Sequence, residues 1–239
     1  MTRMHGSNVR AYLGGRDVSG DLATISPMFQ AATHDATNFA SGGWVEHDPG
    51  LASWECEIDG FYDPTEGSIG RQFEDLLGAS GGVFSVYDGD ADTLGDSGVL
   101  FSDSILSKRG QPVSVADLVK LSGSLRPTNG GKAGLFGKLL HPKGAETNTG
   151  AGASLDNAAS SANGGRANLH VTAITGTWTI RVEHSTNGSD WTTLAAFSGL
   201  DAIGGHTLEV TGTVNHYLRA AHTEDSAGSV TYTLGFARY

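Results

Sequence analysis

Residues 51–78 constrain the fold of this chain most strongly, because a strand pattern runs directly into a helix pattern. Apolar Trp54, Cys56 and Ile58 alternate with polar residues, and a period of two is typical of a strand that buries one face. The opposite face of this strand is acidic and carries Glu55, Glu57 and Asp59. Carboxylates that share one face of a strand indicate a solvated surface or the wall of a channel, and they give no support for catalysis.

The second half of the segment has the signals of a capped helix. Asp63 supplies a side-chain oxygen for the N-cap, Pro64 suits the first turn, and Glu66 stands three residues after the cap. Gly78 follows at a position where a helix end favours a positive φ. Apolar side chains recur between them at helical spacing, at Ile69, Phe73, Leu76 and Leu77. The pattern predicts one helix over residues 64–77.

Composition indicates a mainly β protein that does not grip nucleic acid. The chain has 35 Gly and only 6 Pro, and Thr, Ser and Val recur in short alternating runs between turn residues. The chain has 15 Lys and Arg and 26 Asp and Glu, which gives a net charge of -11. This acidic balance disfavours binding to a phosphate backbone. Cys56 is the only cysteine, so an intrachain disulfide framework and a thiolate metal cluster are excluded.

Membrane and export signals are not apparent in the sequence. No apolar run is long enough to cross a bilayer, and the first ten residues lack the apolar stretch of a signal peptide. We therefore expect a chain that is made in the cytoplasm and does not insert into a membrane.

Residues 30–49 have no sustained period and are rich in small and polar residues, which predicts a long exposed loop. Loops of this kind are uncommon inside compact domains and are often functional. Phe39 and Trp44 are its apolar points. Two exposed aromatic side chains suit docking onto another surface, and packing back onto the same domain is an equal alternative.

The C-terminal part predicts a second β unit. Small residues dominate 126–165, and a domain boundary near the middle of this stretch divides the chain into 1–140 and 141–239. Beyond the boundary, alternating residues precede and follow an Asn187-Gly188 pair, which is a strong signal for a hairpin turn. Strands separated by short turns predict a β-sandwich or jelly roll.

Asp88, Asp90 and Asp92 have the spacing of the first ligands of a calcium loop. The match then fails, because Thr93 stands where such a loop needs Gly and Val99 stands where it needs Glu. We therefore expect a solvated turn and assign no metal here.

Searches for other chemistry find no nucleophile elbow, phosphate-binding loop or dinucleotide fingerprint, so no enzyme activity and no cofactor are predicted. Histidines in or beside the predicted C-terminal strands are most simply half-exposed surface residues. A metal site that joins histidines across strands is a minor alternative. These histidines are His170, His184, His206, His216 and His222.

The order of elements resembles the major tail protein, or tail tube protein, of long-tailed bacteriophages. The resemblance covers about residues 5–130 and rests on SGDL at 19–22, the long loop, GFYD at 60–63, the single helix and a closing hairpin. The second part, with HSTNGSDW at 184–191, NHYLRA at 215–220 and GFAR at 235–238, is similar to a β domain common in phage virion proteins. The implied fold is a tail-tube β-sandwich or barrel domain with one helix, followed by a second β domain.

The resemblance also implies a mechanical function in the virion. Subunits of this family close neighbouring sheets into a β-barrel ring, and the rings stack into a tube through which the genome passes. The implied partners are copies of the chain itself, the tail tip, the tape measure protein and the tail terminator, with DNA passing without sticking. Two arrangements stay open. If the second part decorates the outside of the tube, a ring has six copies; if it is a second tube-like domain, a ring has three copies.

On this hypothesis, residues 30–49 form an inter-ring loop and an acidic face lines the lumen. The loop residues implied are Phe39, Trp44, Glu46 and Asp48, and the lumen residues implied are Glu55, Glu57 and Asp59. The rival hypothesis is a virion module that binds carbohydrate or a receptor through an aromatic platform. Its residues would be Trp178, Trp191 and Tyr217, although Trp178 alternates as a core residue would.

Overall fold

Strands make up most of the molecule. The computed structural model describes residues 6–65, 67–89, 92–128 and 134–239. In this part of the chain, one α-helix accompanies the strands, so the predicted class of a mainly β protein with one helix is confirmed. The elements are η1 (Gly6–Asn8), β1 (Val9–Leu13), β2 (Arg16–Asp17), β3 (Leu22–Asp35), β4 (His47–Phe61), α1 (Ile69–Leu76), β5 (Gly82–Asp88), β6 (Ser97–Gly110), β7 (Lys120–Pro127), β8 (Leu135–Glu146), β9 (Gly150–Ala151), β10 (Leu155–Asp156), β11 (Gly165–Ser185), β12 (Thr192–Leu200), β13 (Gly204–Val210) and β14 (Tyr217–Arg238).

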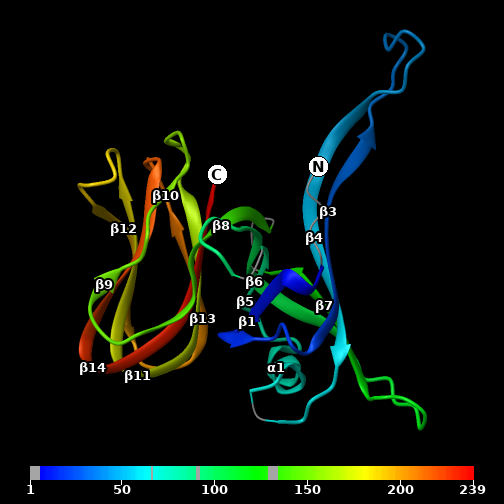
Figure 1. The fold of residues 1–239 in the computed structure, drawn as a ribbon. Helices are drawn as coiled ribbons and strands as arrows, with labels where there is room; N and C mark the ends of the chain where they lie inside the picture. Colours follow the sequence, from blue (N-terminus) through cyan, green and yellow to red (C-terminus); the bar gives the residue numbers. More distant parts are fainter. Residues whose placement is uncertain (1–5, 66, 90–91, 129–133) are drawn as a thin grey trace.

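The strands form one antiparallel hydrogen-bonded network that branches at β6. One edge of β6 pairs with β5, and the other edge pairs first with β8 and then with β7. From β7 the network continues to β4 and β3, and from β8 it continues to β14 and β11. Figure 1 shows the two resulting bodies side by side, with the C-terminal strands on the left and the N-terminal strands on the right. Strands β6 and β8 connect them.

Each body has its own apolar core. The N-terminal core lies between β4 and β7 on one side and β1 and β5 on the other, with α1 closing one end through Ile69 and Phe73. The C-terminal core is built mainly by alternate residues of β11 and β14, including Trp178 and Tyr232. A smaller cluster joins the bodies, and it contains Tyr12, Tyr87, Leu100, Leu139 and Ala237. The predicted boundary between residues 140 and 141 lies inside β8, and the division into two domains stays a prediction.

The predicted loop over 30–49 is too long, because residues 30–35 and 47–49 belong to strands. Strands β3 and β4 pair continuously from Leu22 opposite Gly60 to Asp35 opposite His47, so only residues 36–46 form the connection. The sequence shows no alternation here because both faces of this part of the hairpin are exposed, and neither face requires apolar side chains. Pro27 and Pro49 are tolerated because each lies where its strand pairs on one side only.

The predicted helix cap is also wrong. The helix begins at Ile69 rather than residue 64, because the Asp63 side chain accepts a hydrogen bond from the Thr65 N–H at 2.8 Å and holds a turn instead. The Ile69 N–H donates to the carboxylate of Asp21 at 3.4 Å, so a residue far away in the sequence serves the helix start. Glu66 lies outside the described residues. Gly78 has a φ of 76° and follows the extended residue Leu77.

Candidate assembly surface

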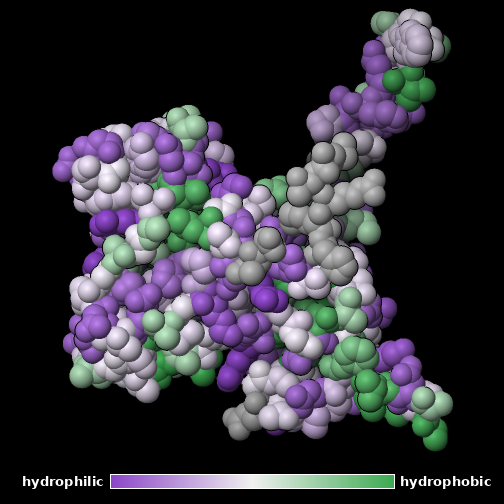
Figure 2. Space-filling view, in the orientation of Figure 1, coloured by the Kyte–Doolittle hydropathy of each residue, from purple (hydrophilic) through white to green (hydrophobic). Residues whose placement is uncertain are grey.

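The β3–β4 hairpin extends away from the body as an arm (Figures 1 and 2). Strand β4 pairs with β7 only over Cys56–Phe61, and beyond that point each strand of the arm has the other as its only partner among the described residues. Among the described residues, strand β3 therefore has one open edge along its 14 residues. A two-stranded hairpin alone is marginally stable in water, so an arm of this length is suited to contacts with another molecule.

The connection at the end of the arm has a defined shape. The Ala36 N–H donates to the Glu46 carbonyl at 2.9 Å, and the Asn38 N–H donates to the buried Ser41 hydroxyl at 3.0 Å. Phe39 is fully exposed, and Trp44 is 80% exposed. Because local hydrogen bonds hold the backbone, the two aromatic rings are presented to solvent rather than packed back onto the chain.

The acidic residues of β4 lie on the face opposite the core, as their alternation predicts. Trp54, Cys56 and Ile58 are buried, while Glu57 and Asp59 are exposed. Strands β3 and β7 flank β4, so this face belongs to a small sheet whose neighbouring side chains are mostly Ser and Thr. The structure brings the three carboxylates to one surface, and their place in a lumen stays a proposal.

Glu55 differs from its two neighbours because it has a cationic partner. Its carboxylate accepts a hydrogen bond from the Ser124 hydroxyl at 2.8 Å and one from Arg126 at 2.6 Å. The hydrogen bond from Ser124, followed by that from Arg126, holds the pKa of Glu55 below its usual range. The sequence analysis missed Arg126, since only the pairing of β4 with β7 brings the two residues together.

A second exposed apolar segment lies at the other end of the same sheet. The pattern over 113–125 suggests a strand, but residues 111–119 form a connection in which Val113, Val115 and Leu118 are exposed. Figure 1 shows this connection in green at the lower right, at the opposite end of the molecule from the arm, and Figure 2 shows apolar atoms on it. The strand-like alternation in fact belongs to an exposed loop, with β7 beginning at Lys120.

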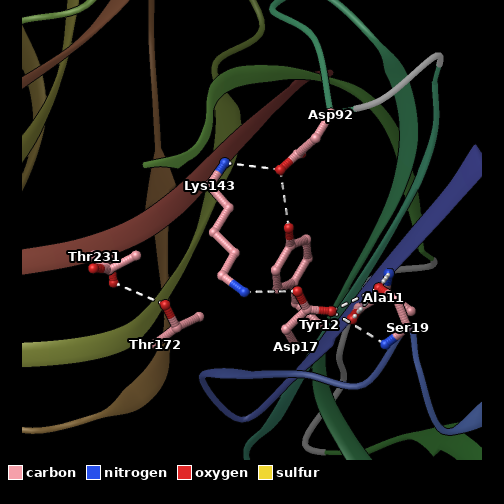
Figure 3. A network of polar contacts seen from close by, with 8 residues as sticks. All are labelled: Ala11, Tyr12, Asp17, Ser19, Asp92, Lys143, Thr172 and Thr231. Carbon is pink, nitrogen blue, oxygen red and sulfur yellow. Dashed lines mark hydrogen bonds and ion pairs between the residues drawn. The ribbon is translucent and has the colours of Figure 1, made fainter. Parts of the chain in front are cut away.

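A polar network links the C-terminal body to the N-terminal one (Figure 3). Lys143 of β8 donates from its Nζ to Asp17 at 2.8 Å, and its backbone N–H donates to Asp92 at 2.9 Å. The Tyr12 hydroxyl also donates to Asp92, at 3.1 Å. Asp90 lies outside the described residues, but Asp92 is an acceptor in this link rather than part of a solvated turn.

The hydrogen bonds of this link favour the ionised form of the Asp17 carboxyl group. Burial alone pushes the pKa of Asp17 upward, but hydrogen bonds from Lys143 and Ser19 outweigh it, and the pKa of Asp17 falls below its ordinary value. Burial also raises the pKa of Tyr12, so this residue is a neutral hydroxyl donor at physiological pH. The network therefore joins the two bodies through an ionised Asp17 carboxylate and a neutral Tyr12 hydroxyl.

The aromatic platform of the rival hypothesis does not form. Trp178 is completely buried, and its indole N–H donates to the Thr175 carbonyl at 3.1 Å. Trp191 lies under the guanidinium of Arg219, which is 4.2 Å from the ring centroid. Since one of the three residues is in the core and another is covered by a cation, they do not present a shared surface to a sugar.

Comparisons with known proteins give structural resemblances only. No protein-family model matches the chain, and no curated protein sequence matches it. A chain from the virion of a native gene transfer agent particle is 15% identical, with a TM-score of 0.43, and covers 53% of this chain and 95% of its own length. A chain of the sheath–tube complex of an extracellular contractile injection system is 12% identical, with a TM-score of 0.40, and covers 53% of this chain and 88% of its own.

The Dit protein of phage SPP1, described as a hub of the adsorption apparatus, is 11% identical with a TM-score of 0.35. This comparison covers 96% of the present chain and 99% of the Dit protein. All three comparisons have TM-scores below 0.5 and identities of 15% or less. Within the described part of the chain, no helix has the length and apolar character needed to span a membrane.

Proposed function

We propose that this chain is a structural, non-enzymatic subunit of a phage-like virion tail, and that copies of it join through the β3–β4 hairpin into stacked rings that form the tail tube. The observation that carries the proposal is the open edge of β3, which is 14 residues long and pairs with β4 alone among the described strands. A long open edge is a template for pairing with another chain. Closing such edges between neighbours in a ring satisfies them all.

In this arrangement the acidic face of β4 lines the channel. Glu57 and Asp59 are exposed and have no cation paired with them among the described residues. Each ring repeats these charges, so the lining repels the phosphates of a passing duplex and does not retain it. The C-terminal body then lies outside the channel, on the side of β6 and β8 away from β3.

Negative-stain electron microscopy of the purified chain over a concentration series tests the proposal. Tubes or stacked rings with a channel wide enough for duplex DNA support it, and rotational averaging separates six copies from three. Tail-tip components are added as an initiator if the chain alone stays monomeric. A chain that remains monomeric with them contradicts the tube, whereas a single ring that never stacks indicates a hub.

The first prediction concerns the end of the arm. The double substitution Phe39→Ser and Trp44→Ser removes apolar area that is mostly exposed in the subunit, so it abolishes stacking and leaves the free energy of unfolding within about 0.5 kcal/mol. Ile203→Ser, which alters an exposed apolar residue of the C-terminal body, is the matched control and keeps the tubes. Sedimentation and thermal melting measure both effects. Normal tubes from the double variant would exclude the arm from the ring-to-ring contact.

A further inference from the structure

Two histidines and one glutamate converge in the C-terminal body, away from the assembly surface. His141 and Glu146 lie on β8, and His222 lies on β14. The Nε2 atom of His141 is 3.2 Å from one oxygen of Glu146, and the Nε2 atom of His222 is 3.4 Å from the other oxygen. One potential ligand atom from each residue lies within 4.8 Å of the other two. The sequence analysis listed His222 as a surface residue, but it is almost completely buried.

These separations match the edges of a metal coordination shell. Zinc binds imidazole nitrogen and carboxylate oxygen at about 2.0–2.1 Å, so two ligands of a tetrahedral site lie about 3.3 Å apart. The two nitrogen–oxygen separations of 3.2 and 3.4 Å are close to this value, although they end on different oxygens of Glu146, so one imidazole lies at ligand spacing from each carboxylate oxygen. Two imidazoles and a carboxylate are also the ligand types that leave a fourth position for water. Glu146 is partly exposed, so solvent and an incoming ion have access from its side.

The surroundings hold the two imidazoles in position. Nδ1 of His222 lies 3.0 Å from the Tyr232 hydroxyl, and the Tyr232 ring stacks on His141 with centroids 4.1 Å apart. When Nδ1 of His222 donates to this hydroxyl, Nε2 carries the lone pair that a metal needs. Nδ1 of His141 is buried and has no hydrogen-bond partner among the described residues. His141 is thus a buried polar side chain whose only polar contact is the candidate site.

Gly150 provides an independent observation. A Cβ atom at this position would lie 3.0 Å from Nε2 of His222, directly beside the candidate ligand atom. Its backbone φ does not lie in the left-handed region, so the conformation does not require glycine. A Cβ atom at this position would fit only if the His222 ring moved by a few tenths of an ångström. The absence of a side chain keeps the approach to the nitrogen open.

We propose that His141, Glu146 and His222 form a binding site for one divalent transition-metal ion, with zinc as the best match and water as the fourth ligand. The ion joins β8 to β14 within the C-terminal body, so its role is to stabilise that body. This inference does not depend on the proposed function, since the site lies apart from the arm and needs no second subunit.

Zinc binding to the full chain tests the site. After treatment with EDTA and buffer exchange, isothermal titration with zinc sulfate shows one ion per chain, and the melting temperature rises when zinc is added. Cobalt gives the visible absorption bands of a tetrahedral site with nitrogen and oxygen ligands. A chain that binds no zinc, or several ions weakly without a rise in melting temperature, overturns the proposal.

Substitutions locate the ion. Glu146→Gln preserves the shape of a partly exposed side chain and lowers zinc affinity by more than about 100-fold, because even changes outside the ligand set cost about 10- to 100-fold. His222→Gln has the same effect, and a far-ultraviolet spectrum checks that the variant is folded. His216→Gln, which alters a partly exposed histidine of the same body, is the matched control and binds zinc normally. Undiminished binding by a folded Glu146→Gln chain overturns the proposed ligand set.

Discussion

Three polar residues at alternate positions of β11 show how single side chains connect the two bodies. Arg166, Asn168 and His170 are all buried, and they face β5 and β6 rather than solvent. Arg166 donates to the Ser102 hydroxyl, and Asn168 donates to the Phe101 carbonyl at 3.1 Å. Because these groups leave water, each needs its partner across the contact, and the bodies therefore dock in one orientation only.

His170 gives this contact a defined sensitivity to acid. Its Nδ1 accepts from the Gly15 N–H at 3.4 Å, so Nε2 carries the proton and donates to the Ser85 hydroxyl at 2.9 Å. Burial, with a smaller effect from His206, lowers the pKa of His170 from 6.5 to about 3. Since the folded pKa lies below the unfolded one, the contribution to stability is complete above about pH 6.5 and is lost as the pH falls toward 3.

The second prediction follows from this shift. Between pH 7.5 and pH 5 the wild-type chain loses about 2 kcal/mol of stability through His170 alone, at about 1.4 kcal/mol per pH unit below 6.5. His170→Gln lacks this loss, so its urea-unfolding free energies at the two pH values differ by correspondingly less. His216→Gln is the control. Hydrogen bonding to Asp156 raises the pKa of His216, so protonation of His216 adds stability as the pH falls, and removing this histidine does not reduce the loss. Equal losses in wild type and His170→Gln would contradict the assignment.

At the scale of elements, the buried face of β4 is the part that was predictable. A period of two placed Trp54, Cys56 and Ile58 in the core, and all three are there. The existence of the helix was predictable, but its first residue was not. The first helical N–H donates to Asp21, which is distant in the sequence. Asp21 lies nearby because its carbonyl packs closely against Gly60. Such a partner leaves no local signal.

The arm and the metal-type cluster were not predictable for a related reason. Strand propensity is read from burial on one face, and the outer part of the arm has no buried face. His141, Glu146 and His222 meet only because β14 folds back between β8 and β11, and their spacing in the sequence matches no metal motif. Sequence patterns report contacts between residues that are close in the sequence. The arm and the cluster depend on contacts between residues that are far apart in it.

The third prediction concerns α1. Phe73 is completely buried, and a Cβ atom at Gly123 of β7 would lie only 2.4 Å from its ring, so the ring occupies space that the glycine leaves free. Phe73→Ala opens a cavity there and lowers the free energy of unfolding by about 3–5 kcal/mol. Leu77→Ala, which changes a half-exposed residue just after the helix, costs less than about 1 kcal/mol. Chemical denaturation measures both, and similar costs for the two variants would contradict the packing.

The fourth prediction concerns the acidic face of β4. Glu57→Lys reverses a charge that repeats in every subunit of the proposed tube, so assembled variant tubes bind short duplex DNA at low salt and release it as salt is raised. Wild-type tubes bind no DNA. Asp201→Lys, an equal reversal on an exposed loop of the C-terminal body, produces less binding inside the tube. Protection of the DNA from added nuclease distinguishes the lumen from the outer surface, and equal protection in the two variants would place Glu57 outside the lumen.

At the scale of the whole molecule, exposed apolar residues occur at opposite ends of the N-terminal body (Figure 1). Phe39 and Trp44 are at the end of the arm, and Val115 and Leu118 are in the connection before β7. Two different surfaces at opposite ends suit a head-to-tail contact, which repeats without closing and produces a filament. We therefore propose that the arm of one ring contacts the 111–119 connection of the next.

The fifth prediction tests this polarity by mixing. Val115→Ser with Leu118→Ser prevents stacking, as the double substitution at the arm does, and each variant retains one intact surface. A mixture of the two variants then forms stacks of two rings at most. The intact arm of one variant contacts the intact 111–119 connection of the other, but neither outer face of such a pair can bind a further ring. Electron microscopy counts the rings in each stack. Long tubes from the mixture, or from either variant alone, would show that the two surfaces do not contact each other.

The position of β14 in the sheet has a consequence for the order of events during synthesis. Strand β14 pairs with β8, β9, β10 and β11, all of which precede it in the chain, so it occupies the centre of the C-terminal body. A nascent chain cannot complete this body until residue 238 has left the ribosome, however early the arm is made. A prematurely terminated chain lacks the strand that its partners require. Such a product cannot complete the C-terminal body, so it does not provide a finished subunit for the proposed tube.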